Sequence, residues 1–452
     1  MRAAVLVVAA AASADDAPWK FLASYPAQLD ALPCENVTID GVLDEPCWRK
    51  APWTGPFEDI AQPLHPGARI PDSYQTKVAV AYSSDSLYVA AVLKETNLWA
   101  TIRGHNEDLT DHKAPWWNQD FECFFDASRT THNYVEFETN ALNATYDVLW
   151  RVPQHGFDSL GVPCAPGAAT WCGNSTFNGG NQTWTLAPGL EAATAADRAF
   201  VPLDGDPRGD WTVELRFPLA QAHGGGLLNG GPAPADGVFW SANFARAEHP
   251  LPRTGADALS LDFSAKNYTA FCADVLAKHP TLLGTDQWSC YWEWVWQNMG
   301  ATRYMHNPDL WGLLRFASSE APEAPCRDPQ YPLRHVLHNA QRAMISAFLN
   351  DGAYPESLGA LARCGAACCN ATTSCDPSAL AVAATTPAVF NVSVAVAPGA
   401  ACVDYAARTT TGGPCFTLSA TFANPETGFV ARGTIREDRY TTVVGDAATG
   451  CL

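Results

Sequence analysis

The strongest constraint on the fold is a period-two alternation of apolar and polar residues that recurs between residues 28 and 318. Residues 76–82 alternate large side chains with Lys and Ala, and residues 86–93 repeat the pattern after a Ser-Ser-Asp turn. Alternation with this period is typical of a strand with one buried face, so the two segments predict a β-hairpin. Further strands are predicted at 120–126, 133–140, 145–151, 211–217, 238–246 and 310–316.

The segments between these strands show no amphipathic helix of the length that parallel strands need for their crossovers. We therefore predict a mainly β domain at 28–318, an antiparallel β-sandwich of jelly-roll-like form. Residues 157–207 are rich in Gly, Ala, Asn and Pro, and they are expected to form a long loop insertion. In the strand at 211–217, the alternation predicts that Trp211 faces the core and Glu214 the solvent.

A second domain is expected at residues 329–452, after a Pro-rich linker at 319–328. The spacing of apolar residues predicts a helix at 331–349. Strands are predicted at 390–397, 401–407, 415–422 and 429–435, which gives a small Cys-rich α+β domain. The role of this domain is left open by its sequence.

The N-terminus has the pattern of a secretory signal peptide over residues 1–14. Arg2 precedes an apolar run at 3–12, and Ala12-Ser13-Ala14 offers a cleavage site. The run is shorter than the roughly 20 apolar residues that cross a bilayer, so we expect a secreted protein without a membrane span. The chain has 28 Lys+Arg against 47 Asp+Glu, and a net charge of −19 argues against nucleic acid as a partner.

The 15 cysteines suit an oxidising compartment, where they are candidates for disulfide bonds. Cys123 lies inside an apolar strand pattern and is expected to be the odd thiol of the first seven, whereas the eight from Cys326 onward can all pair. Short gaps in sequence suggest the pairs Cys34 with Cys47, Cys164 with Cys172, and Cys272 with Cys290. Sequons for N-glycosylation occur at Asn36, Asn143, Asn174, Asn181, Asn267, Asn370 and Asn391.

Sixteen tryptophans are an informative excess, because they are too many to be explained by one small core. Trp211 and Trp240 lie in alternating strands and are expected to be core residues. Trp116 and Trp117 lie in a loop just before the strand at 120–126. Two interpretations remain open for them: their rings stack on a sugar, or they form a hydrophobic plug under the loop.

Several short segments form an ordered set along the chain. They are Ile-Asp-Gly-Val-Leu-Asp-Glu at 39–45, Pro-Trp-Trp-Asn-Gln-Asp-Phe-Glu at 115–122, Tyr-Val-Glu-Phe-Glu-Thr-Asn at 134–140, Asn-Phe-Ala-Arg at 243–246 and a closing segment at 305–316. In this order they resemble the carbohydrate-binding module family 9-like domains, over roughly residues 36–317. The resemblance implies a sugar-binding β-sandwich of the kind attached to xylanases and other glycoside hydrolases, with structural calcium.

The resemblance also implies a site. Trp116 aligns with the first of two tryptophans that clamp a terminal sugar, and Glu122 with a glutamate that binds its hydroxyls. The chain departs from the family pattern at Met305, where the second tryptophan is expected, and at Glu138, where a strand arginine is expected. The sugar specificity of the family therefore does not carry over. The candidate sugar-binding residues are Trp116, Trp117, Glu122, Glu138, Asn140, Asn243 and Arg246, and Trp292, Trp294 and Trp296 offer either a replacement platform or further core.

Glu136 and Glu138 lie two residues apart on one strand, so both point to the same face. Three interpretations are open: a catalytic pair, hydroxyl or calcium binding, or a solvated strand face. Glycoside hydrolysis needs carboxylates on opposite sides of the scissile bond, which disfavours catalysis by two neighbours on one strand. In a separate acidic loop, Glu107, Asp108 and Asp111 are candidate calcium ligands, with an ordinary acidic turn as the alternative.

These observations predict a secreted protein that binds a poly- or oligosaccharide by aromatic stacking and hydroxyl hydrogen bonds, in support of carbohydrate catabolism. One alternative is a glycoside hydrolase acting through Glu122, Glu136 or Glu138. Another is an extracellular adhesion module whose aromatic surface binds protein. Calcium is the one cofactor expected, and the oligomeric state is left open.

Overall fold

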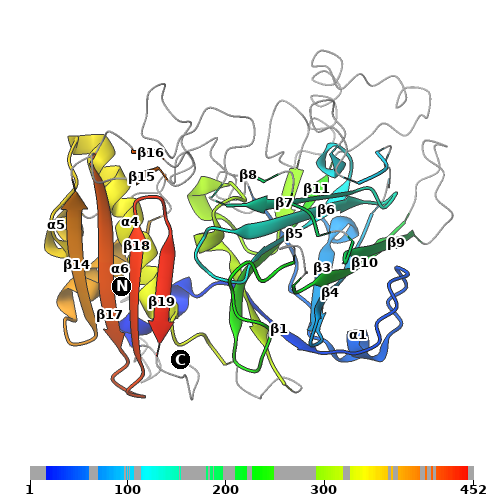
Figure 1. The fold of residues 1–452 in the computed structure, drawn as a ribbon, viewed down its shortest axis with the longest axis horizontal. Helices are drawn as coiled ribbons and strands as arrows, with labels where there is room; N and C mark the ends of the chain where they lie inside the picture. Colours follow the sequence, from blue (N-terminus) through cyan, green and yellow to red (C-terminus); the bar gives the residue numbers. More distant parts are fainter. Residues whose placement is uncertain are drawn as a thin grey trace, which may run out of the picture.

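The computed structural model describes residues 17–60, 70–95, 98, 100, 102–105, 114–151, 153, 180–181, 184–186, 188–196, 209–220, 226–248, 292–318, 326–364, 368–369, 375–397, 403–404, 409–410, 414–445 and 452. The predicted signal peptide at 1–14 lies outside these residues. Among the helices of the described residues, none is both long and apolar enough to span a membrane. The structure has a larger β part and a smaller α+β part beside it (Figure 1).

In the described residues, 13 strands form one continuous sheet in the larger part. The order is β8-β7-β6-β5-β11-β13-β1-β3-β4-β10-β9, with β12 paired to β11 and β2 paired to β12. The mainly β class predicted from the sequence is therefore confirmed. The strands are β1 Gln28–Pro33, β2 Glu58–Asp59, β3 Thr76–Tyr82, β4 Ser86–Leu93, β5 Asp120–Asp126, β6 Tyr134–Asn140, β7 Thr145–Trp150, β8 Gly180–Asn181, β9 Glu191–Ala196, β10 Trp211–Pro218, β11 Phe239–Glu248, β12 Trp292–Val295 and β13 Gly312–Phe316.

Strand β1 joins two arms of this sheet. Its residues from Gln28 to Ala31 pair in parallel with β13, and Leu32 and Pro33 pair in parallel with β3, whereas the other pairings between the described strands of this sheet are antiparallel. The arms pack face to face: the Phe217 ring of β10 lies 5.5 Å from that of Phe125 on β5. The result is a two-layered arrangement with one aromatic and aliphatic core between the layers.

Strand β10 shows where the alternation pattern succeeds and where it fails. Trp211 and Phe217 lie in the core as predicted. The prediction that Glu214 faces solvent is wrong, because the segment that precedes β3 covers this face and buries the carboxyl group. The Trp48 indole N–H donates to Glu214 Oε1 at 2.9 Å, and the Gly41 N–H donates to Oε2 at 3.2 Å. Burial raises the pKa of Glu214 to about 7.

Strand β9, Glu191–Ala196, lies within the stretch that was predicted as a loop insertion. It pairs antiparallel with β10 at the edge of the sheet, so the prediction of loop over all of residues 157–207 is wrong at this segment. Its side chains are small or polar and only partly buried, as is common at a sheet edge. Four of its six residues are Ala and one is Glu, which carry little strand signal, and this is why the strand was missed.

The smaller part places helices on an antiparallel sheet of order β14-β17-β18-β19. Helix α4, Tyr331–Asp351, confirms the helix predicted at 331–349. Its apolar residues at helical spacing are buried against the sheet, and Gly352 ends it with a φ of 72°. The other elements are α5 Leu358–Cys364, α6 Pro377–Thr385, β14 Phe390–Ala397, β15 Val403–Asp404, β16 Thr409–Thr410, β17 Cys415–Ala423, β18 Val430–Arg436 and β19 Thr441–Gly445.

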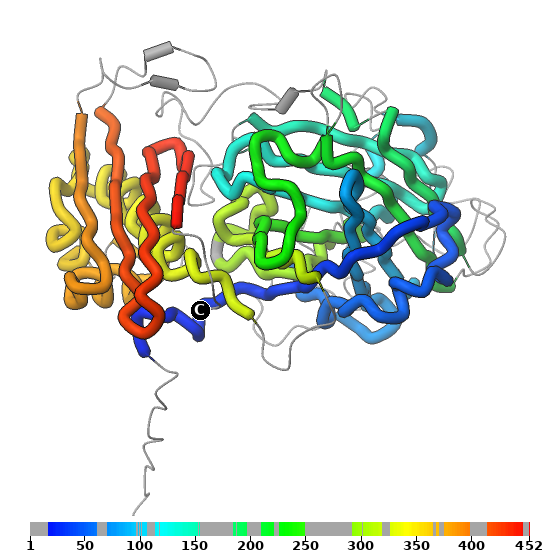
Figure 2. The backbone as a smooth tube through the Cα atoms, turned by 60° about the horizontal axis from the view of Figure 1, so that its bottom comes forward, coloured from blue at the N-terminus to red at the C-terminus, as the bar shows by residue number. Residues whose placement is uncertain are grey.

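Both ends of the chain build the core of the smaller part. The Trp19 ring lies 5.8 Å from that of Phe422 on β17, and the Phe21 ring lies 6.0 Å from that of Phe390 on β14. Figure 2 shows the N-terminal segment, in blue, passing from the smaller part into the larger one. The smaller part therefore takes apolar residues from the N-terminal side of β1 as well as from 329–452.

Buried polar contacts also join the two parts. Arg342 of α4 forms an ion pair with Asp309 at 2.5 Å, and Arg129 forms one with Asp328 at 2.7 Å. Burial by itself raises the pKa of Asp309, but the Arg342 guanidinium group outweighs it and holds that pKa well below its usual range. Breaking either pair would remove a close compensating partner of a buried charge.

Disulfide bonds are present in both parts. The predicted bond between Cys34 and Cys47 is confirmed, and Cys123 is a buried free thiol, as expected. The smaller part contains the bonds Cys364–Cys368 and Cys369–Cys375. The predicted pairs Cys164 with Cys172 and Cys272 with Cys290 lie outside the described residues.

Candidate functional site

The outer face of β5 and β6 collects carboxyl groups. Phe121 and Cys123 of β5 point into the core, so Glu122 points to the opposite face of the sheet. Glu122 lies directly across from Glu138 of β6, and the same alternation places Glu136 on that face. The strand register alone thus brings three glutamates together, which we call the acidic face: Glu122, Glu136 and Glu138.

The acidic face is not exposed to bulk solvent. Glu122, Glu136 and Glu138 are 5%, 6% and 2% exposed, so the interpretation as a solvated strand face is wrong. The Trp150 indole N–H donates to Glu136 Oε2 at 2.5 Å, and the Trp116 backbone N–H donates to Glu138 Oε2 at 3.2 Å. In the described part of the chain, no hydrogen bond reaches the carboxyl group of Glu122.

Burial and mutual repulsion keep much of this face protonated. Burial raises the pKa of Glu122 and of Glu138 well above the usual value, and the charge of Asp120 raises both further. Burial also raises the pKa of Glu136 to about 7 and that of Glu293 to about 8. Near neutral pH the face therefore carries both carboxylates, which accept hydrogen bonds, and carboxylic acids, which donate them.

Aromatic rings surround the carboxyl groups. Tyr146 of β7 lies beside Glu138, and Tyr134 stacks on Trp150 with ring centroids 6.2 Å apart. The Tyr134 hydroxyl group lies 2.8 Å from Nδ1 of His306, whose pKa burial lowers to about 3, so this histidine is neutral. These buried rings form a packed floor beside the carboxyl groups.

Trp116 stands at the edge of the acidic face. It lies in the short 3-10 helix Pro115–Trp117, where Pro115 fixes the first turn. Its side chain is half-buried, and its backbone is tied to Glu138. The side chain of Trp117 lies outside what the structure describes. Of the predicted sugar-binding residues, the structure brings Trp116, Glu122 and Glu138 together.

Two of the predicted sugar-binding residues, Asn140 and Asn243, form hydrogen bonds with backbone groups of the protein. Asn140 Oδ1 accepts from the N–H groups of Leu142 and Ala144 and so holds the turn after β6. Asn243 Oδ1 accepts from the Gln297 N–H at 2.9 Å, and its Nδ2 donates to the Gln297 carbonyl oxygen at 3.0 Å. Both side chains are fully buried. Their hydrogen bonds fix the strand ends around the acidic face.

Arg246 lies on the other side of the sheet. Its position on β11 puts the guanidinium group inside the sandwich, where it is fully buried between the rings of Tyr74 and Trp294. It forms ion pairs with Glu95 and, at 2.8 Å, with Glu248. The strand period separates Arg246 from Glu122 by the thickness of the sheet, so the structure does not bring them together.

The two tryptophans of β12 and the one directly after it belong to the core. Trp292, Trp294 and Trp296 all pack between the two arms, which decides between the two alternatives left open by the sequence. Met305, at the position expected for a second clamp tryptophan, is buried, and its sulfur lies 3.4 Å from Asn243 Nδ2. Glu293 was not predicted as a site residue. It lies between Trp292 and Trp294, which point into the core, and this alternation indicates that its side chain points to the outer face.

The remaining predicted residues divide by location. Asn36, Asn143 and Asn391 are exposed, as glycosylation requires. Among the described residues, no group of three or more His, Cys, Asp or Glu is arranged to hold a metal ion. The candidate calcium ligands Glu107, Asp108 and Asp111 lie outside the described residues. The sequon residues Asn174, Asn267 and Asn370 also lie outside them, and for Asn181 the side chain is not among those described.

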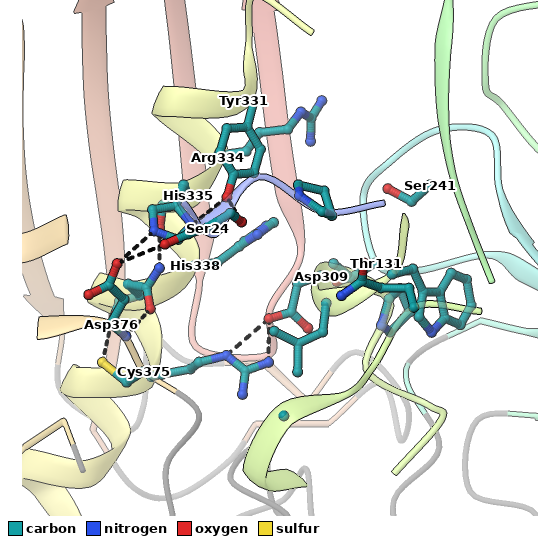
Figure 3. A pocket seen from close by; sticks show the side chains of 18 of the residues that line it. Ser24, Thr131, Ser241, Asp309, Tyr331, Arg334, His335, His338, Cys375 and Asp376 are labelled. Carbon is teal, nitrogen blue, oxygen red and sulfur yellow. Dashed lines mark hydrogen bonds and ion pairs between the residues drawn. The ribbon is translucent and has the colours of Figure 1, made fainter. Parts of the chain in front are cut away.

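A hollow lies between the two parts of the protein. It has a volume of about 580 Å³ and is lined by Asp309 and Trp311 from the larger part and by Arg334, His335 and His338 from α4. Figure 3 shows the ion pairs inside it: Asp309 binds the neighbouring arginine, and His335 lies 3.2 Å from Asp376. Its charged groups are largely bound to one another, so this hollow is part of the interface.

No protein-family model matches the chain, and no significant match occurs among curated proteins. Similar solved structures include a carbohydrate-binding module of family 9 from Caldicellulosiruptor kristjanssonii, in complexes with cellotriose and with glucose. Both are 13% identical, cover 66% of this chain and 100% of their own, and have a TM-score of 0.32. A candidate carbohydrate-binding protein from Bacteroides uniformis is 13% identical, with 64% and 99% coverage and a TM-score of 0.35. The family that the sequence resembles is thus also present among the structural neighbours.

Proposed function

We propose that the protein binds a poly- or oligosaccharide on the outer face of β5 and β6, within a jelly-roll-like sandwich of the family 9 type. One observation carries the proposal: half-buried Trp116 is tied by its backbone to Glu138. Glu138 lies directly across from buried Glu122, whose carboxyl group accepts no hydrogen bond from the described residues. A ring beside buried hydrogen-bonding groups is the usual composition of a sugar site.

The chemistry of each group fits a sugar. The Trp116 ring offers an apolar plane for the C–H face of a pyranose, and Glu122 offers oxygen atoms to its hydroxyl groups. A buried carboxyl group without a hydrogen bond costs free energy, which a bound hydroxyl group would recover. The floor of Tyr134 and Trp150 would keep the site in shape before the ligand arrives.

We propose binding rather than hydrolysis for this face. Glu122, Glu136 and Glu138 lie on one side of one sheet, whereas glycosidic cleavage needs carboxyl groups on two sides of the bond. The carboxyl groups therefore approach a ligand from one direction only. We further propose that the protein is secreted, N-glycosylated and active in carbohydrate catabolism, with calcium in its acidic loop.

A glycan array on the purified chain tests the proposal. We expect binding to at least one glycan, with loss of affinity in Glu122→Gln. Glu214→Gln is the matched control, because Glu214 is also a buried glutamate with a raised pKa but lies on the other arm. An array without any binding, or equal affinities in Glu122→Gln and the parent protein, would contradict the proposal.

A further inference from the structure

Among the described residues, the glutamates of the acidic face have no bound basic partner of the kind that usually accompanies buried carboxylates. In the described part of the chain, no ion pair joins Glu122, Glu136 or Glu138 to a basic side chain. Arg246, on the same sheet, is directed to the opposite face and already bound to Glu95 and Glu248. Buried carboxyl groups are normally paired, so this face has capacity for a cation that the described residues do not supply.

Two acidic side chains of β5 have oxygen atoms without hydrogen bonds in the described part of the chain. Residue Glu122 is 5% exposed and its carboxyl group accepts no hydrogen bond there, and Oδ2 of fully buried Asp120 is also without one. The other oxygen of Asp120 is satisfied by the Ala247 N–H at 3.0 Å. The carboxyl oxygens without hydrogen bonds therefore both belong to β5, and they indicate a ligand that donates hydrogen bonds.

We propose that the sugar bound at the acidic face carries a free ammonium group, as the glucosamine unit of a de-N-acetylated polysaccharide does. This inference rests on the proposed function and names the class of sugar. An ammonium group has three donors and one positive charge, so it matches several carboxylate oxygens at once, whereas a hydroxyl group donates once. The half-buried ring of Trp116 adds a surface that attracts a cation.

A metal ion fits these residues less well than an ammonium group. No group of three or more acidic, His or Cys side chains among the described residues has the arrangement of a metal site. Metal ions need short, convergent oxygen ligands, whereas an ammonium group on a sugar is positioned by the ring that carries it. Trp116 supplies the plane that would position such a ring.

A change in the protonation of the acidic face gives a second way to detect a bound ammonium group. In the free protein, burial and neighbouring charges raise the pKa values of these glutamates, and that of Glu136 lies at about 7. A bound ammonium group favours the ionised carboxylates and lowers these pKa values, so binding releases protons to the solvent. The titratable and charged groups around the face are Asp59, Asp120, Glu122, Glu136, Glu138, Tyr134, Tyr146, Glu293, Tyr304, His306 and Arg439, with Arg246 across the sheet.

Titration calorimetry with three tetrasaccharides of equal length tests this inference: the glucosamine tetramer, its fully N-acetylated form and cellotetraose. At pH 6 and low salt we expect the glucosamine tetramer to bind at least tenfold more tightly than the other two. In buffers of different ionisation enthalpy, only the glucosamine tetramer should release protons. Glu122→Gln should reduce the preference, and Glu214→Gln, as the folding control, should keep it.

Every other result would count against the ammonium inference. Equal or tighter binding of cellotetraose or of the N-acetylated tetramer would overturn the ammonium inference and leave sugar binding in place. Failure of all three tetramers would also overturn it, and the glycan array then decides on sugar binding by itself. A preference for the glucosamine tetramer that persists in Glu122→Gln would show that its charge is recognised elsewhere on the protein.

Discussion

Glu122 and Glu138 lie side by side on neighbouring antiparallel strands, both buried and both acidic. Like charges directly opposite in a sheet destabilise it, and burial adds to the cost. The pair therefore weakens the fold at the place where it concentrates hydrogen-bonding capacity. Such an arrangement is typical of a binding site, where stability is reduced in favour of function.

Glu122→Gln is accordingly expected to stabilise the protein while it weakens glycan binding. At a pH where both groups ionise, removal of one acidic group relieves the repulsion with Glu138, which is worth about 0.5–1 kcal/mol. Thermal unfolding of the variant and the parent protein measures the gain. A lower melting temperature, together with weaker binding, would indicate that Glu122 supports the fold rather than a ligand.

The melting temperature is expected to decrease as the pH rises from about 5 to 8. The pKa values of Glu136 and Glu293 are raised to about 7 and about 8, so the folded state holds protons that the unfolded state has lost. Their contribution to stability is complete below the ordinary pKa near 4.5 and is lost as the pH rises through 7 and 8. Each unit of pKa shift is worth about 1.4 kcal/mol.

Glu136→Gln provides the check on this pH dependence. The variant should show a shallower decrease of the melting temperature between pH 5 and 8. Below pH 4 both proteins should lose stability, because the low pKa of Asp309 reflects an ion pair that protonation breaks. A slope that is the same in the two proteins would assign the pH dependence to other groups.

Trp116→Ala separates a sugar contact from a core role. We expect a loss of about 1 kcal/mol in affinity, roughly fivefold in Kd, with little change in the melting temperature. Trp53→Ala is the matched control, because Trp53 is another half-buried tryptophan but packs on the outer face of the β3–β4 arm. Unchanged affinity in a folded Trp116→Ala protein would remove this ring from the site.

Cleavage of the chain between residues 319 and 325 should leave the two fragments associated. Trp19 and Phe21 stay in the core of the smaller part, and Arg342 stays paired with Asp309, so both apolar and ionic contacts cross the cut. Size-exclusion chromatography of the nicked protein measures this. Asp309→Asn should promote dissociation, because breaking a buried ion pair costs about 3–5 kcal/mol. Separation of the parent fragments would mean that these contacts are weak.

Much of the strand framework could be predicted from the sequence, because one buried face imposes a strict period of two. The β3–β4 hairpin and β5 follow the predicted residues closely, and α4 follows its apolar spacing. Strand β1 was not predicted, since its parallel partners come from distant parts of the chain. Such pairing depends on the tertiary fold and leaves little local pattern.

The candidate site was predictable only in part. The period of two placed Glu136 and Glu138 on one face, yet it cannot say whether that face is covered. For this reason the burial of Glu214 and of the acidic face was missed. The pattern of Asn-Phe-Ala-Arg grouped Arg246 with the site, whereas its position on β11 directs it to the core.

The position of Trp19 and Phe21 in the core of the smaller part also affects how the protein is made. Ribosomes complete the segment around residue 20 long before β14 and β17, which supply its partners Phe390 and Phe422. Until the last quarter of the chain has emerged, these rings have no native surface to cover them. Nascent chains that stop early would therefore display an apolar N-terminal segment, which is the kind of feature that chaperones bind.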